Sequence, residues 1–151
     1  MLIALDSVAQ ITPYTLIAPQ RQEVAYLINQ DGDIVHTWEL RGLTATSAYL
    51  LPDGQLVRTV MVDNPPYEAG GRAGAVERIA WDGQVLWRYE IASERFHSHH
   101  DIDVMPNGNV LVLSWEKLDE ADALAAGRRP DAIPDDGVWA EVIFELKPIG
   151  Q

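Results

Sequence analysis

The stretch VMPNGNVLVLSW, residues 104–115, places two short apolar runs on either side of a Pro-Asn-Gly turn. The same arrangement occurs earlier in the chain, in LLPDGQLVRTV at residues 50–60. Asn-Gly or Asp-Gly between apolar runs favours a β-hairpin, because tight hairpin turns need the positive φ angles that glycine adopts freely. The turn glycines of the two stretches are Gly54 and Gly108. The chain therefore contains two copies of one hairpin.

A second hairpin type alternates with the first. It occurs in INQDGDIVHTW at residues 28–38 and in IAWDGQVLWRYE at residues 79–90, with turn glycines Gly32 and Gly83. The turn glycines of each hairpin type are separated by a similar distance along the chain. A repeat of about this length, with four strands per unit, is typical of a β-propeller. In that fold the blades stack because one sheet cannot bury both of its faces alone. A β-sandwich also contains many hairpins, but it does not require two hairpin types that alternate at a fixed period.

The repeat predicts an all-β fold, a β-propeller whose blades are four-stranded antiparallel sheets. The propeller is expected to be incomplete in this chain. We expect a partial blade in residues 1–40, a complete blade in 41–91 and a partial blade in 97–151, or about two and a half blades. The expected strands are 13–18, 24–29, 33–39, 46–51, 55–61, 76–81, 84–90, 100–105, 109–115 and 140–147. Because closed propellers have about 4–8 blades, this pattern predicts the N-terminal part of a larger domain. Unpaired edge strands would then favour self-association.

Composition narrows the function classes. The 23 acidic residues outnumber the 11 basic ones, for a formal charge of -12, so we expect neither nucleic acid nor an anionic membrane as a partner. The absence of cysteine excludes disulfides, zinc–thiolate sites and cysteine nucleophiles. The first residues have no basic region followed by a long apolar run, so no signal peptide is expected, and the compartment stays open.

Two features of the loops and aromatic residues complete the fold prediction. The segment DEADALAAG, residues 119–127, predicts a short helix capped by Asp119, within a long connection between two strands. The aromatic strand residues Trp38, Trp81, Trp87 and Tyr89 are expected to pack between blades.

Three of the four histidines stand directly before the second copy of the first hairpin, at His97, His99 and His100. The offset that relates Gly54 to Gly108 also aligns Ala-Thr-Ser at residues 45–47 with His-His-Asp at residues 99–101. The repeated scaffold therefore does not require histidine here, and a local reason is needed. In a propeller these residues would stand at the channel mouth, on the face that carries the long connections.

Three interpretations of the histidine cluster stay open. It is a polar surface loop, a metal site that includes Asp101 and Asp103, or an acid/base or anion-binding site built on one or two imidazoles. Because neighbouring strand residues point to opposite faces, only part of the cluster could converge on a metal, and we expect none. Arg72, in the glycine-rich loop AGGRAGA, could bind an anion or could be a solvated loop side chain.

The segments HHDIDVMPNGNVLVLSWE, YTLIAPQRQEVAYLINQDGDIVHTW and GAVERIAWDGQVLWRY resemble, in order and spacing, the N-terminal part of the arylsulfotransferase family. The resemblance implies a six-bladed propeller that transfers a sulfuryl group from a phenolic sulfate ester to a phenol through a sulfated histidine. It implies no metal, nucleotide donor or other cofactor, and often an exported or periplasmic protein. His100 corresponds to one histidine of the family's site, whereas the sulfated histidine and the family's arginine lie in later blades.

We predict His100 and His99 as catalytic residues and Asp101 and Arg72 as substrate-binding residues; of these, the resemblance itself assigns only His100. Aryl sulfates and phenols are the expected partners, and the chain by itself is expected to be inactive. The alternative is a non-catalytic propeller whose channel mouth binds a ligand or a protein. A third interpretation is a metal-dependent hydrolase that binds its metal through His99 and His100.

Overall fold

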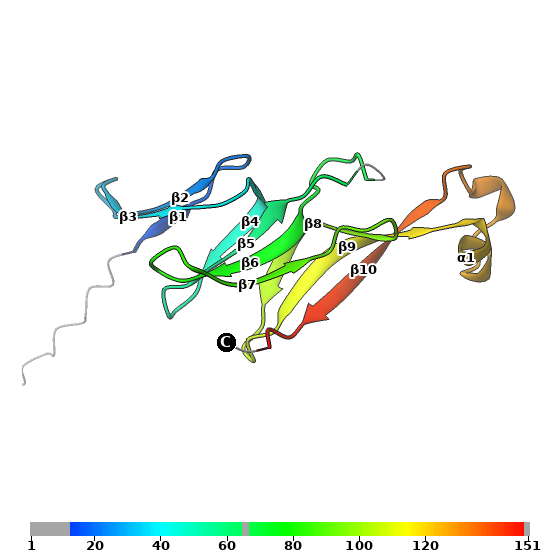
Figure 1. The fold of residues 1–151 in the computed structure, drawn as a ribbon. Helices are drawn as coiled ribbons and strands as arrows, with labels where there is room; N and C mark the ends of the chain where they lie inside the picture. Colours follow the sequence, from blue (N-terminus) through cyan, green and yellow to red (C-terminus); the bar gives the residue numbers. More distant parts are fainter. Residues whose placement is uncertain (1–12, 65–66, 150–151) are drawn as a thin grey trace, which may run out of the picture.

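The computed structural model describes residues 13–64 and 67–149 and is all-β, with three antiparallel sheets (Figure 1). Within each sheet, strands that follow one another in the chain pair with each other. The first sheet comprises β1 (Thr15–Ile17), β2 (Val24–Ile28) and β3 (Ile34–Glu39); the second comprises β4 (Thr44–Leu50), β5 (Leu56–Met61), β6 (Gly74–Ile79) and β7 (Val85–Glu90); the third comprises β8 (Phe96–Val104), β9 (Val110–Leu118) and β10 (Val138–Leu146).

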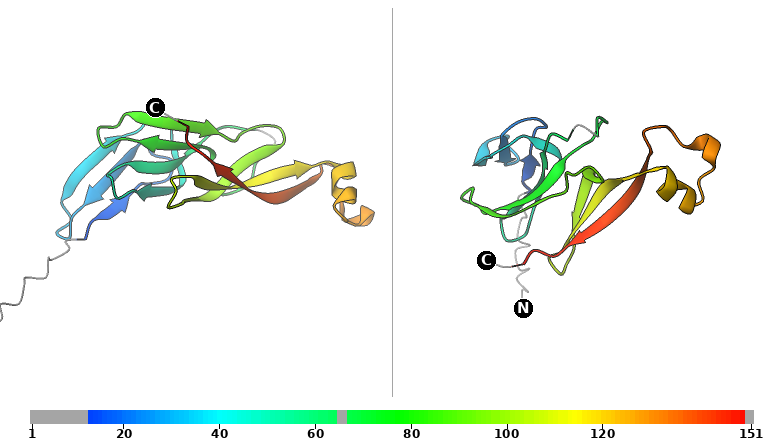
Figure 2. Two further views of the ribbon diagram at one scale, coloured as in Figure 1. Left: turned by 90° about the horizontal axis from the view of Figure 1, so that it is seen from below. Right: turned by 45° about the vertical axis from the view of Figure 1, so that its right-hand side comes forward.

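The expected strands and their grouping into sheets of three, four and three strands are confirmed within the described residues, except that β8 begins at Phe96 and not near residue 100, so His97 and His99 lie within a strand. Residues 1–12 of the first expected blade and 150–151 of the third lie outside the described residues. The three sheets do not form a closed ring (Figures 1 and 2). None of the helices in the described ranges has the length and apolar character that crossing a bilayer requires.

The sequence repeat is also a repeat of backbone geometry. The register between β4 and β5 shifts between Thr44 and Ala48, and the register between β8 and β9 shifts between Ser98 and Ile102. The offset between these two bulges equals the offset between the turn glycines of the same hairpins. The β2–β3 and β6–β7 pairs likewise share an irregularity, at positions related by the offset of their own turn glycines. Both hairpin types therefore keep their bulges from one sheet to the next.

The middle sheet is buried on both faces, because its strands direct alternate side chains to the two neighbouring sheets. Leu56 belongs to an apolar layer with the first sheet, whereas Val57 belongs to a layer with the third. The first layer also contains Ala25, Leu27, Trp38, Leu40 and Ile79, and the second also contains Val76, Ile91, Ile102, Val110 and Val112. Figure 2 shows the three sheets following one another in chain order.

The expected packing of the aromatic residues against a neighbouring sheet is observed for three of the four. Trp38 is buried, and Trp87 packs against the second apolar layer. Trp81 is 47% exposed but still packs between the first and middle sheets, whereas Tyr89 is 50% exposed, so the expectation was wrong for Tyr89. Trp81 lies in the turn before β7 and stacks on His36, with the ring centroids 3.8 Å apart. Tyr89 lies on β7, an edge strand of the middle sheet, which leaves it open to solvent.

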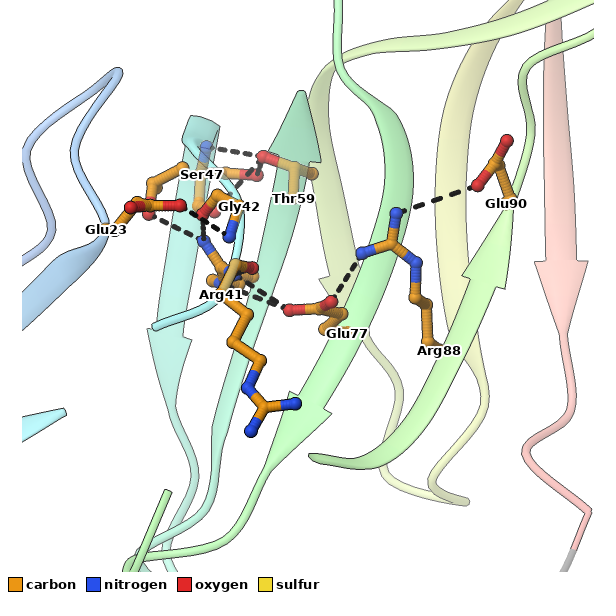
Figure 3. A network of polar contacts seen from close by, with 10 residues as sticks. Glu23, Arg41, Gly42, Ser47, Thr59, Glu77, Arg88 and Glu90 are labelled. Atoms are coloured by element: carbon orange, nitrogen blue, oxygen red, sulfur yellow. Dashed lines mark hydrogen bonds and ion pairs between the residues drawn. The ribbon is translucent and has the colours of Figure 1, made fainter. Parts of the chain in front are cut away.

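A buried arginine, Arg58, stands on β5, an inner strand of the middle sheet; Figure 3 shows Glu77 and Arg88 of the polar network around it. Arg58 is fully buried, and all five of its N–H groups have acceptors. Nε and Nη2 donate to one carboxylate oxygen of Glu77 at 3.2 and 2.9 Å. Nη1 donates to the Thr44 hydroxyl at 3.0 Å and the Gly42 carbonyl at 2.9 Å, and Nη2 donates to the Arg41 carbonyl at 2.6 Å. The charge is therefore balanced inside the sheet.

The long connection between β9 and β10 contains the predicted helix. α1 spans Glu120–Ala125, and the side chain of Asp119 caps it by accepting a hydrogen bond from the backbone N–H of Asp122 at 2.8 Å. A short 3-10 turn follows at Pro130–Ala132. Arg95, before β8, reaches Asp122 of this helix at 3.2 Å, and the Arg95 carbonyl accepts a hydrogen bond from the Tyr67 hydroxyl. The connections to β6, β8 and β10 therefore meet at one end of the sheets.

Candidate functional site

The glycine-rich loop before β6 lies against the start of β8. The backbone N–H of His100 donates to the carbonyl of Gly71 at 2.7 Å, and Arg72 forms an isolated antiparallel bridge with His99. The sequence placed these residues in two separate motifs, and the structure brings both motifs together. The site thus combines the bulge of β8 with a loop from the preceding sheet.

The bulge of β8 differs from the equivalent bulge of β4 in which group accepts the hydrogen bonds from its backbone N–H groups. In β4 the N–H groups of Thr46 and Ser47 donate to the hydroxyl of Thr59, each at 3.0 Å (Figure 3 shows Ser47 and Thr59). The position of Thr59 is taken by Leu113 in the later copy, which has no acceptor. The Gly71 carbonyl replaces that hydroxyl for the N–H of His100, so the bulge now depends on the neighbouring loop.

His100 has φ of 51°, a left-handed backbone conformation that is uncommon for residues other than glycine, although asparagine, aspartate and histidine adopt it more often than the rest. Its ring lies over Gly71, where a Cβ atom would collide with the imidazole. Gly71 itself has φ of 79°, which is the main reason that glycine is favoured there. His100 is exposed, and its position is fixed by its backbone and by this close contact with the loop.

His99 is buried, with 3% of its side chain exposed, and its ring stacks on Trp115 at 4.1 Å between centroids. Nε2 of His99 lies 2.9 Å from a carboxylate oxygen of Glu141 on β10, and Nδ1 lies 2.8 Å from Nδ1 of His100. Burial lowers the pKa of His99 below its ordinary value, and the Glu141 carboxylate opposes this only in part. The imidazole of His99 is therefore neutral at pH 7, and its contact with Glu141 is a hydrogen bond from N–H to carboxylate.

Asp101 connects the second and third sheets. One of its carboxylate oxygens accepts a hydrogen bond from the Tyr49 hydroxyl at 2.7 Å and another from the backbone N–H of Ile102 at 2.8 Å. The hydrogen bond to Asp101, followed by burial, raises the pKa of Tyr49 to about 12. This oxygen has a structural use between the sheets, and the substrate-binding role of Asp101 stays a prediction.

Arg72 is half-buried and is not paired with a carboxylate in the part of the chain that the structure describes. Its Nη1 donates to the backbone carbonyl of Tyr67 at 3.3 Å. Arg72 also lines a small cavity of about 110 Å³, together with Arg21, Thr46 and Gly71. This guanidinium, on the same loop as the Gly71 that the His100 ring packs against, could receive an anionic group.

His97 is separate from the other two histidines. It is fully buried, stacks on Tyr67 with centroids 5.3 Å apart, and contacts the Asn64 amide through Nδ1 at 3.2 Å. Its Nε2 has no hydrogen-bond partner among the described residues. Burial, with smaller contributions from Arg72 and His99, lowers the pKa of His97 to about 4. The cluster of three histidines thus divides into a core residue and a pair.

Two residues of the site were not found from the sequence. Glu141 lies on β10, far along the chain from His99, and Trp115 lies on the intervening β9. Glu141 pairs in register with Trp115, which pairs in register with His97. The contact of Glu141 and Trp115 with His99 therefore depends on the register of the three strands in the third sheet. The internal repeat could not supply the register, because the connection before β10 is longer than the one before β6.

The metal interpretation gains no support from the described residues, where no three or more His, Asp or Glu side chains are arranged to hold a metal ion. No protein-family model matches the sequence, and a search of the curated proteins finds no match.

Proposed function

We propose that the three sheets are successive blades of a β-propeller, and that His100 with Arg72 belongs to a site for sulfuryl transfer from aryl sulfates. The fold part of the proposal is supported by the order of the sheets and by the bulges that recur at a fixed offset. Stacked blades bury the middle sheet on both faces, as observed. Further blades would cover the outer faces of the first and third sheets, which leave Ile34 and Ile143 exposed.

One observation carries the function: an exposed histidine in an uncommon left-handed backbone conformation packs on the loop that also carries Arg72, an arginine with no carboxylate partner among the described residues. A conformation of this kind persists only where the surrounding structure enforces it, and it is concentrated at functional sites. The same position in the preceding sheet is Thr46, so the scaffold does not require the imidazole. The chain has a formal charge of -12, so most of its surface is expected to repel anions. The Arg72 guanidinium, without a carboxylate partner among the described residues, is a local positive charge that favours an anionic substrate.

The chemistry suits these two groups. In sulfuryl transfer the bond between sulfur and the phenolic oxygen breaks, the sulfuryl group passes to a nucleophilic histidine of a further blade, and the leaving oxygen keeps the bonding electron pair. A protonated His100 would donate its Nε2 proton to that oxygen, while Arg72 would balance charge on the sulfuryl oxygens. Donors directed at developing negative charge are an effective way to lower such a barrier.

Binding of 4-nitrophenyl sulfate to the chain tests the proposal. We expect saturable shifts of the His100 side-chain resonances in NMR titrations, with the His36 resonances unchanged. His100→Asn keeps a residue type that tolerates positive φ, and it should weaken binding at least about tenfold, equivalent to about 1.4 kcal/mol.

Arg72→Gln should weaken binding to a similar degree, whereas Arg128→Gln, at an exposed loop arginine, serves as the matched control and should leave binding unchanged. Equal affinity of the wild type and His100→Asn would contradict the proposal and favour a propeller without sulfuryl chemistry.

A further inference from the structure

We infer that Glu141 is a positioning residue that sets the tautomer of His100 through His99. Three side chains from two strands form a continuous line of hydrogen bonds: Glu141 Oε2 to His99 Nε2 at 2.9 Å, then His99 Nδ1 to His100 Nδ1 at 2.8 Å. The chemical meaning of this line rests on the proposed function, but the line itself does not. Glu141 lies on β10 and both histidines lie on β8, on either side of β9.

The direction of each hydrogen bond in the line follows from the Glu141 carboxylate, at the end of the line away from His100. An ionised carboxylate can only accept, so Nε2 of His99 carries the proton and donates it to Glu141. His99 is neutral because it is buried, so its other nitrogen, Nδ1, has a lone pair. That lone pair must accept from His100, whose Nδ1 therefore carries a proton. Nε2 of His100 is the nitrogen left to exchange a proton with a ligand.

The middle of the line is rigid and its ends are accessible. His99 has 3% of its side chain exposed, and its ring is fixed by stacking on Trp115. Glu141 is 62% exposed, so its carboxylate is solvated. His100 is exposed at the other end. The bulge in β8 makes the line feasible, because consecutive residues in a regular strand would direct their side chains to opposite faces.

A fixed Nδ1–H at His100 matters for proton transfer. A protonated His100 donates from Nδ1 to His99 and from Nε2 to the leaving phenolic oxygen. When the Nε2 proton moves to that oxygen, the N–H electron pair stays on Nε2, and the bond to His99 is unchanged. If His99 Nδ1 instead donated to His100 Nδ1, neutral His100 would keep its proton on Nε2 and could not accept one there. Glu141 thus selects the form of His100 that can both give and take a proton at one atom.

Histidine side-chain NMR on the whole chain, without ligand, tests this inference. At about pH 8, above the ordinary histidine pKa of about 6.5, the ¹⁵N spectrum should show the proton of His99 on Nε2 and that of His100 on Nδ1. In Glu141→Ala the preference of His100 for Nδ1–H should be lost. In Glu141→Lys an ammonium replaces the acceptor, so the line should reverse and the proton of His100 should move to Nε2.

Glu145→Ala is the matched control, because Glu145 is exposed on the same face of β10 and bonds to Asn109 instead. It should give the wild-type spectrum. A wild-type His100 with its proton on Nε2 would overturn the inference without any variant, as would an unchanged tautomer in Glu141→Lys. Since the measurement needs no ligand, its outcome is independent of whether aryl sulfates bind.

Discussion

The buried imidazole of His97 should make the stability of the protein depend on pH, and His97→Phe should remove that dependence. The ring of His97 is fully buried and stacked on Tyr67, and its Nε2 has no hydrogen-bond partner among the described residues. Phenylalanine has a similar shape and can keep the stacking. The substitution gives up the contact between Nδ1 and the amide of Asn64, but that amide also donates to the carbonyl of Ser93 at 2.8 Å.

The magnitude follows from the two pKa values. Burial lowers the pKa of His97 from 6.5 to about 4 in the folded protein, whereas in the unfolded chain it is about 6.5. Between these values the unfolded state binds more protons, so stability is complete above about pH 6.5 and is lost as the pH falls toward 4. The linkage relation gives a loss of about 2 kcal/mol at pH 5 and about 3 kcal/mol at pH 4 from this one group.

Urea denaturation followed by tryptophan fluorescence, repeated between about pH 8 and pH 4, measures this loss. His99 also has a lowered pKa and contributes in the same direction in both proteins, so the comparison of variants isolates His97. The curve for His97→Phe should be flatter than the wild-type curve by about 3 kcal/mol over this range. Parallel curves for the wild type and His97→Phe would refute the reasoning.

Two further predictions concern the polar contacts within and between the sheets. Glu77→Gln leaves the buried charge of Arg58 without a counter-ion, so we expect a loss of about 3 kcal/mol in the free energy of unfolding. Glu90→Gln changes an exposed partner in the same network and should cost less than about 1 kcal/mol in the same urea titration. Asp101→Asn replaces the charged acceptor of the Tyr49 hydroxyl, so the pKa of Tyr49 should fall from about 12 toward the ordinary value of about 10. NMR titration of the tyrosine ring carbons measures this fall, and an unchanged value would show that Asp101 is not its cause.

The strands, their grouping and the short helix could be predicted because their signals are local. Asp-Gly and Asn-Gly turns fix where each hairpin reverses, and the alternation of two hairpin types fixes which strands share a sheet. Asp119 marks the start of α1 for a similar reason, since a capping side chain bonds only to nearby backbone. Tyr89 was assigned wrongly and Trp81 is more exposed than expected, because apolar character shows that a residue can be buried but not which strand face or edge is covered.

The candidate site was found from the sequence only in part. The repeat singled out residues 99–101 as a departure from the scaffold, and the loop of Arg72 was recognised by its glycines. The sequence could not separate His97 from the pair or add Glu141 to it. It also gave no sign that Arg58 is buried, since arginine in a strand is usually exposed. Each of these depends on which side chains face each other across paired strands.

The sequence by itself determined the hairpins, their alternation and the positions of their turns, since turn chemistry and strand period act between near neighbours in the chain. Only the tertiary structure decided the line from Glu141 through His99 to His100. That line requires the register of three strands, a bulge that turns two neighbouring side chains to one another, and a loop from another sheet that supplies the carbonyl of Gly71. Such contacts join residues far apart in the chain, and only packing of the sheets brings them within hydrogen-bond distance.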